Sequence, residues 1–108
     1  MFRYGLVCSL ETLSPEKPAV YQGPFAAYAD KIRAIGYDDI ELHLRNPRQY
    51  DARSLARIAA DAGLAFCALS TGLEYGLNGL NLISADPSVR TAAIHRLREH
   101  TYMAADPT

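Results

Sequence analysis

The chain has 108 residues, of which 11 are lysine or arginine and 12 are aspartate or glutamate, so its formal net charge is −1. An apolar fraction of 49% with so little charge argues against disorder, and the lack of net positive charge argues against a strong electrostatic nucleic-acid binder. Two cysteines exclude a disulfide scaffold, no apolar run approaches the roughly 18 residues of a membrane helix, and the N-terminus lacks a signal-peptide pattern, so we expect a protein of the reduced cytoplasm.

The first part of the chain reads as a strand followed by a helix. Residues 4–10 are almost continuously apolar, as in a strand that is buried on both faces. After a long connection over 11–23, apolar residues at helical spacing predict a helix over 25–35. Pro24 suits the first helical position and Gly36 suits a left-handed cap at the end.

A second strand is expected over 39–44, and its polar side chains form a row. Glu41, His43 and Arg45 face the side opposite the apolar residues, because successive strand residues point opposite ways. At the carboxyl end of a strand that opens into a binding site, these groups would hold a substrate hydroxyl, transfer a proton and bind a phosphate or carboxylate, respectively. A structural polar network that closes the strand end would explain the same row.

The helix after this strand is expected to begin at Asp51, its N-cap, and to end at Gly63. Arginines recur through this region and offer a basic surface; they are Arg45, Arg48, Arg53 and Arg57. Aspartates are interspersed, and Arg57 with Asp61 has the spacing of an ordinary helix pair. We therefore expect a solvated helix face rather than a nucleic-acid site.

A third strand is expected over 64–70. Ser70 and Thr71 at its end are placed either to bind a ligand or to cap the strand. The stretch 71–79 contains three glycines and lacks a phosphate-loop pattern. We expect a loop there, which either contacts a polyol through Glu74, Tyr75 and Asn78 or is an ordinary surface loop.

The last helix has the clearest start, with Asp86 as N-cap and Pro87 at the first helical position, and its apolar stripe runs to residue 104. His95 and His100 on this helix have no partner at metal-ligand spacing, and we expect both at the surface. Both cysteines are expected to be small buried side chains. No cluster of histidine, cysteine or carboxylates is sufficient for a metal site.

Strands that alternate with helices imply a parallel sheet with right-handed crossovers. The long connections follow the strands, so the functional end lies beyond the carboxyl ends of the strands. All the helices would cover one face of the sheet and leave the other face and both edges open. We therefore expect the chain to be marginally stable, to self-associate through the open edges, or to assemble with a complementary fragment.

Three stretches, in order, resemble segments of one enzyme family. They are Gly-Tyr-Asp-Asp-Ile-Glu-Leu-His-Leu at 36–44, the third strand with Thr-Gly after it at 62–72, and the last helix at 86–105. They are similar to the second strand, third strand and third helix of the sugar phosphate isomerase/epimerase family, which has a xylose isomerase-like barrel fold. The resemblance implies that residues 1–108 are the first three βα units of a (β/α)8 TIM barrel, truncated after the third helix.

The resemblance also implies metal-dependent proton transfer between adjacent carbons of a sugar or hydroxy-ketone, with Mn²⁺, Mg²⁺ or Co²⁺ polarising the substrate oxygens. The family's metal ligands come from later strands, so we expect no metal on this chain, no catalytic residue within it and no turnover by it alone. The resemblance carries over Glu41, His43, Ser70 and Thr71 as substrate-side residues. With Arg45 and Glu74 they form the candidate substrate-binding set: Glu41, His43, Arg45, Ser70, Thr71 and Glu74.

Two other classes of protein stay open. A fragment of an endonuclease IV-like barrel, which acts on abasic DNA, is supported by the basic run and opposed by the net charge of −1. A non-catalytic α/β interaction module would form a defined dimer without affinity for sugars or metals. The expected partners are a sugar-type small molecule and a second copy of the chain, not nucleic acid or a membrane.

Overall fold

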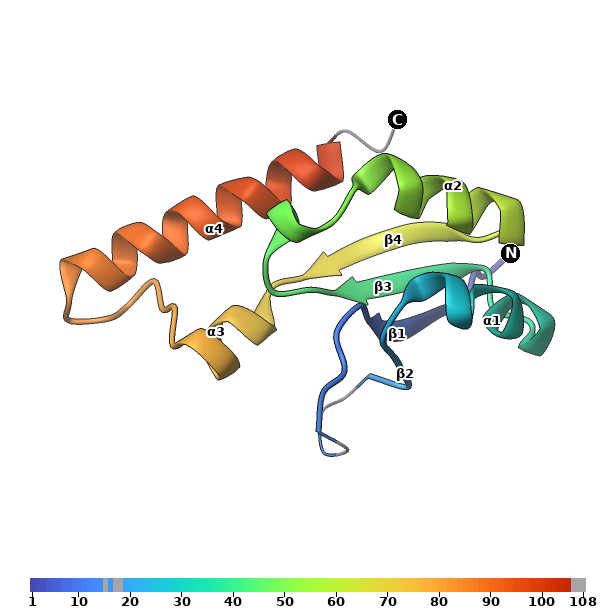
Figure 1. The fold of residues 1–108 in the computed structure, drawn as a ribbon, viewed down its shortest axis with the longest axis horizontal. Helices are drawn as coiled ribbons and strands as arrows, with labels where there is room; N and C mark the ends of the chain where they lie inside the picture. Colours follow the sequence, from blue (N-terminus) through green and yellow to red (C-terminus); the bar gives the residue numbers. More distant parts are fainter. Residues whose placement is uncertain (15, 17–18, 106–108) are drawn as a thin grey trace.

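Four parallel strands form a single sheet in the computed structural model, which describes residues 1–14, 16 and 19–105. In chain order, the strands are β1 (Gly5–Ser9), β2 (Tyr21–Gln22), β3 (Asp39–His43) and β4 (Ala65–Ser70). They lie in the spatial order β2-β1-β3-β4 (Figure 1). The prediction of a parallel α/β fold is confirmed, and the three longer strands lie where the sequence predicts them.

Strand β2 was not expected, because it is formed by two residues of the long connection after β1. Val20 N donates to Val7 O and Gly23 N donates to Ser9 O, both at 3.0 Å, and these bonds hold the returning chain beside β1. Two residues are too few to show an apolar alternation in the sequence.

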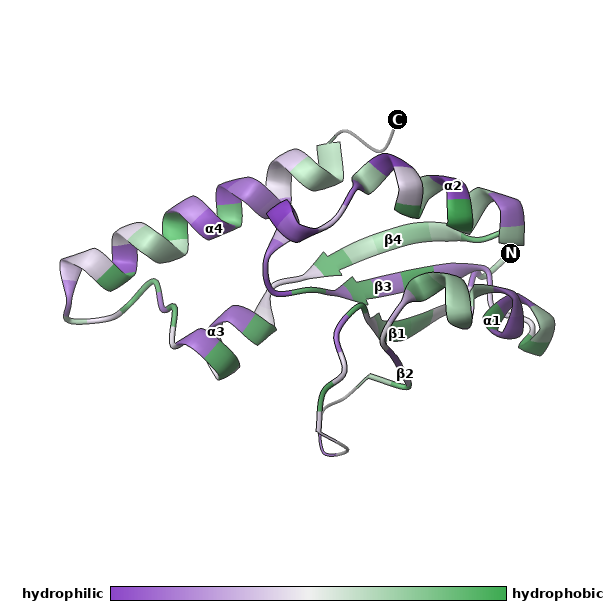
Figure 2. Ribbon diagram, viewed as in Figure 1, coloured by the Kyte–Doolittle hydropathy of each residue, from purple (hydrophilic) through white to green (hydrophobic). Residues whose placement is uncertain are grey.

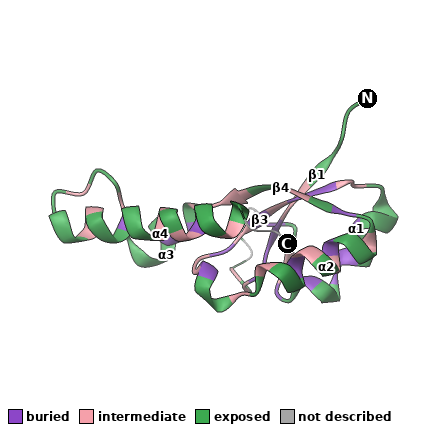
Figure 3. Ribbon diagram, turned by 90° about the horizontal axis from the view of Figure 1, so that it is seen from above, coloured by how far each residue is buried: buried purple, intermediate pink, exposed green. Residues whose placement is uncertain are grey.

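Helices α1 (Ala29–Ile35) and α2 (Ala52–Ala62) pack on one face of the sheet and leave the opposite face open (Figure 3). Each follows a short 3-10 turn, η1 (Phe25–Ala27) before α1 and η2 (Pro47–Gln49) before α2. The predicted ends at Gly36 and Gly63 are confirmed, and so is the N-cap Asp51. The predicted start of the first helix was wrong, because Pro24 precedes the turn η1 and α1 begins at Ala29. The Asp51 side chain accepts a hydrogen bond from Arg53 N at 3.1 Å.

The core lies between these two helices and the sheet. Ile40, Leu42 and Leu44 alternate toward the helices and are at most 1% exposed. Figure 2 shows mostly hydrophobic colours along β1 and β4, whereas β3 alternates between hydrophobic and hydrophilic residues. Tyr28 completes the core, with its hydroxyl donating to Ser9 O at 2.9 Å, and burial raises the pKa of this tyrosine.

The two cysteines differ in burial. Cys8 is fully buried, as predicted, and burial raises the pKa of its thiol to about 11. Cys67 is exposed, so the prediction that it is buried was wrong. It lies on edge strand β4, next to an irregularity in the pairing of β3 with β4.

The stretch 71–79 does not form the expected loop, because most of it is helix α3 (Gly72–Asn78). Leu73 and Glu74 are buried in its first turn, and Gly79 ends it with a φ of 68°. Burial of the apolar Leu73 side chain compensates for the weak helix propensity of the glycines.

Helix α4 (Pro87–Ala105) begins as predicted, since Asp86 Oδ1 accepts from Ser88 N at 2.8 Å. It does not cover the sheet, however, and most of it extends past the end of the strands (Figure 1). Ala93 is buried, whereas Ile94 and Thr101 from the predicted stripe are exposed. The expectation that all helices cover one face was therefore wrong for α4.

A bidentate ion pair joins the N-terminal segment to the start of β3. Arg3 Nη2 lies 2.7 Å from Asp39 Oδ1, and Arg3 Nε donates to Asp39 Oδ2 at 2.9 Å. The hydrogen bonds from Arg3 hold the pKa of Asp39 below its ordinary value. A carboxylate with a lowered pKa stabilises the fold above its unfolded pKa of about 3.9, and this stability is lost as the pH falls through that range.

We therefore expect Arg3→Gln to flatten the pH dependence of stability on the acid side. Urea midpoints measured from neutral pH down to the range where aspartate is protonated would fall less steeply in the variant than in the wild type. Arg57→Gln is the matched control, because Arg57 is exposed and makes no ion pair within the described residues. Identical pH profiles for wild type and Arg3→Gln would show that this pair does not contribute.

Candidate functional site

Two members of the predicted polar row meet on the open face of the sheet. His43 Nε2 lies 3.4 Å from Glu41 Oε1, and the His43 side chain is only 13% exposed. Strand alternation places both on the side away from the core, as predicted. A carboxylate beside an imidazole can orient the ring, and an imidazole can both accept and donate a proton, so the pair is suited to proton transfer.

Arg45 does not join this pair, because it lies past the end of β3 and is held by Glu11. Arg45 Nε is 3.7 Å from Glu11 Oε2, and Arg45 N donates to Glu11 Oε1 at 3.3 Å. Burial and the Glu11 carboxylate raise the pKa of the neighbouring Tyr50. Glu11 and Arg45 line a cavity of about 340 Å³ at the carboxyl end of the sheet.

The sequence reasoning missed Glu11 as a site residue. It follows β1 directly, and carboxyl ends of neighbouring parallel strands lie at the same edge of a sheet. That position was the signal that could have identified it.

The remaining candidates lie where β4 passes into α3. Ser70 is the register partner of His43 across the β3–β4 pair, which places it beside the Glu41–His43 pair. Thr71 and Glu74 instead line a cavity of about 280 Å³ between α3 and α4. The six predicted residues therefore divide into three groups along one end of the sheet rather than converging on a single cavity.

Glu74 is the most unusual of these side chains. It is 4% exposed, and its Oε1 accepts a hydrogen bond from Asn78 Nδ2 at 3.0 Å. Its Oε2 lies 3.3 Å from Arg96 Nε, yet it has no hydrogen-bond partner. Within residues 1–14, 16 and 19–105 it is the only buried side-chain oxygen or nitrogen of this kind.

Arg96 of α4 connects Glu74 to the segment after β3. Its Nη1 lies 2.9 Å from Glu99 Oε2 and also donates to the Asn46 side chain. Glu99 in turn pairs with Arg48, with 2.7 Å between Arg48 Nε and Glu99 Oε1. Helices α3 and α4 and the turn η2 are thus joined by one network of charges.

His100 also connects α4 to the sheet, which corrects the prediction that it lies at the surface. It is 3% exposed, with Nε2 3.1 Å from Leu44 O and Nδ1 2.9 Å from Arg96 O. Both partners are acceptors, so a neutral ring donates to one of them and a doubly protonated ring to both. His95 is exposed, as predicted.

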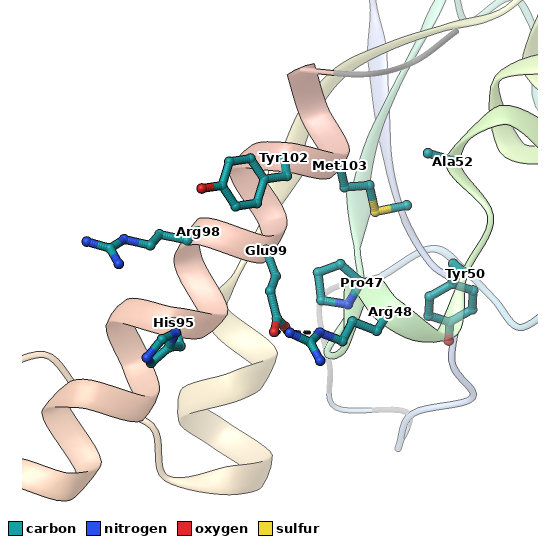
Figure 4. Close-up of a pocket in the computed structure, with 9 residues that line it drawn as sticks. All are labelled: Pro47, Arg48, Tyr50, Ala52, His95, Arg98, Glu99, Tyr102 and Met103. Carbon is teal, nitrogen blue, oxygen red and sulfur yellow. Dashed lines mark ion pairs between the residues drawn. The ribbon is translucent and has the colours of Figure 1, made fainter.

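A cavity of about 580 Å³ lies between η2, the start of α2 and the C-terminal half of α4. Figure 4 shows the Arg48–Glu99 ion pair across it, with Arg98 extending away from that pair. The rings of Tyr50 and Tyr102 contribute to its lining. Because Glu99 compensates the charge of Arg48, the cavity does not form a concentrated cationic site.

The described residues do not fit the metal that the resemblance implies. No group of three or more histidine, cysteine, aspartate or glutamate residues within them is placed to hold a metal ion.

Helix α4 is the longest helix of the described chain, yet neither it nor any other helix there combines the length and apolar character needed to cross a membrane. No protein-family model matches the chain, and no curated protein matches it either.

Proposed function

We propose that this chain is a sugar phosphate isomerase/epimerase-like protein in which the carboxyl ends of the strands bind a polyhydroxylated substrate. The observation that carries the proposal is Glu74 Oε2, a buried carboxylate oxygen without a hydrogen-bond partner, in a residue that lines a cavity. The charge of this carboxylate is paired with Arg96, whose Nε lies 3.3 Å from Oε2, but the oxygen accepts no hydrogen bond, and a substrate hydroxyl would supply one. Thr71 and Arg96 line the same cavity and add a hydroxyl and a guanidinium that can bind further substrate oxygens.

The Glu41–His43 pair is the candidate for moving a proton. Isomerisation of a hydroxy-ketone requires a group near the substrate that can accept a proton from one carbon and return it to the next. The Glu41–His43 pair, with 3.4 Å between imidazole and carboxylate on the open face of the sheet, has this capacity. It does not line the cavity of Glu74, so it would act on a substrate that extends from that cavity along the carboxyl ends of the strands.

Replacing Glu74 with glutamine tests the binding role directly, because glutamine keeps the volume and removes the charge. The probe is D-ribulose 5-phosphate, titrated into the ¹⁵N-labelled chain. In the wild type we expect amide shift changes at Thr71, Glu74 and Arg96. A hydrogen bond to a charged acceptor contributes about 1.5–3 kcal/mol, so Glu74→Gln should weaken binding by roughly 10-fold to 100-fold.

Glu99→Gln is the matched control, because Glu99 also pairs with Arg96 but does not line the cavity that Thr71 and Glu74 share. It should leave the affinity close to that of the wild type. Absence of shift changes around Glu74 in the wild type would contradict the proposal. Equal weakening by both variants would assign the effect to Arg96 and not to the Glu74 oxygen.

A further inference from the structure

The two edges of the sheet are protected to different degrees. Strand β2 forms one edge and has only two residues, and short length is a common protection against pairing with another chain. Strand β4 forms the other edge with six residues, Ala65–Ser70, none of which is charged or proline. Within the described chain no strand pairs with the outer side of β4. The backbone N–H and C=O groups on that side can therefore form hydrogen bonds with a strand of another chain.

An apolar groove runs beside this edge on the helix side of the sheet. It encloses about 250 Å³ between β4, α2 and the end of α4, and its lining includes Leu55, Phe66, Leu69 and Met103. An occupant of the edge therefore needs a strand backbone together with apolar side chains on one face.

Strand β4 itself has this character. The irregularity in the β3–β4 pairing sets Phe66 opposite Ile40 and Leu69 opposite Leu42. Since Ile40 and Leu42 both face the helices, Phe66 and Leu69 lie on the same face of β4 although they are three positions apart.

We propose that two copies of the chain associate by antiparallel pairing of their β4 strands about a two-fold axis between Cys67 and Ala68. This register sets Phe66 of each copy opposite Leu69 of the other, on the face where each groove lies. Small side chains meet on the open face, and no like charges are opposed because the strand has none. The net charge of −1 on each chain adds little repulsion between the copies.

The exposed thiol on β4 gives a direct test of this register. Two Cys67 side chains would lie on either side of the axis, within reach of a short bismaleimide such as bismaleimidoethane. We expect cross-linking of the native protein to give a covalent species of twice the 11.9 kDa chain mass on a denaturing gel. Cys67→Ser should abolish the species, and Cys8→Ser should leave it, because Cys8 is fully buried.

Ala68→Lys separates a defined dimer from random collision, because it sets two positive charges beside the axis. Light scattering should give a dimer mass for the wild type and a monomer mass for this variant. Ala60→Lys on the exposed side of α2 is the matched control and should remain a dimer. A monomeric wild type, or a dimer that persists in Ala68→Lys with its circular dichroism unchanged, would overturn the proposal. The interface uses neither Thr71 nor Glu74, so its failure is distinguishable from failure of the substrate site.

Discussion

Replacing Ile32 with alanine is expected to lower the free energy of unfolding by about 3 kcal/mol, within the range of roughly 2–5 kcal/mol for large-to-small changes in a core. Ile32 is 0% exposed and lies on the face of α1 that packs against the sheet. The loss combines the transfer free energy of the removed carbons with the cavity that they leave. For a domain whose total stability is about 5–15 kcal/mol at most, this is a large fraction.

Ile35→Ala on the same helix is the matched control, since Ile35 is 63% exposed. It should change the free energy of unfolding by no more than about 0.5 kcal/mol. Urea unfolding followed by circular dichroism measures both variants against the wild type. Similar losses for the two variants would mean that α1 does not pack through the face that the structure shows.

The contrast between Ile32 and Ile35 shows what the apolar periodicity can establish. The spacing predicts the helix and includes both residues in one stripe. It does not show which member of the stripe finds a partner, because that depends on how far the sheet extends beneath the helix. Ile35 is the last helical residue before Gly36, where α1 has no core to cover.

Helix α3 shows why local composition failed for the stretch 71–79. Three glycines favour a loop on propensity alone. The helix forms because Leu73 is buried and because Arg96, from a helix much later in the chain, lies beside Glu74. Neither contact is visible in a short stretch of sequence.

In the candidate site too, local sequence patterns predict some features, whereas contacts between distant segments decide the others. Alternation along one strand was sufficient to predict that Glu41 and His43 share a face, and the structure places them 3.4 Å apart. The pairing of Arg45 with Glu11 joins two different strand ends, and local patterns do not specify such contacts. The sequence predicts a possible contact of Glu74 with a polyol. Only the fold shows that Glu74 is buried and that its Oε2 accepts no hydrogen bond.

The second large effect is expected at His100, where phenylalanine would keep the ring and remove its hydrogen bonds. The bonds of the ring to Leu44 O and Arg96 O would then be lost, and a carbonyl left without its donor in a buried position costs about 1–3 kcal/mol. Because the bond to Leu44 O joins α4 to the end of β3, backbone amides in the C-terminal half of α4 should also exchange faster with solvent. Urea unfolding and hydrogen exchange measure the two effects separately.

His95→Phe is the matched control on the same helix, since His95 is exposed and should change stability by no more than about 0.5 kcal/mol. His100→Gln tests the chemistry, because its amide can donate to Leu44 O and should recover part of the loss. If His100→Gln is more stable than His100→Phe, the loss in the phenylalanine variant is due to the missing hydrogen bond, because phenylalanine keeps the shape of the ring. Equal losses at His100 and His95 would show that α4 is held by the Arg96 network alone, with the imidazole contributing nothing.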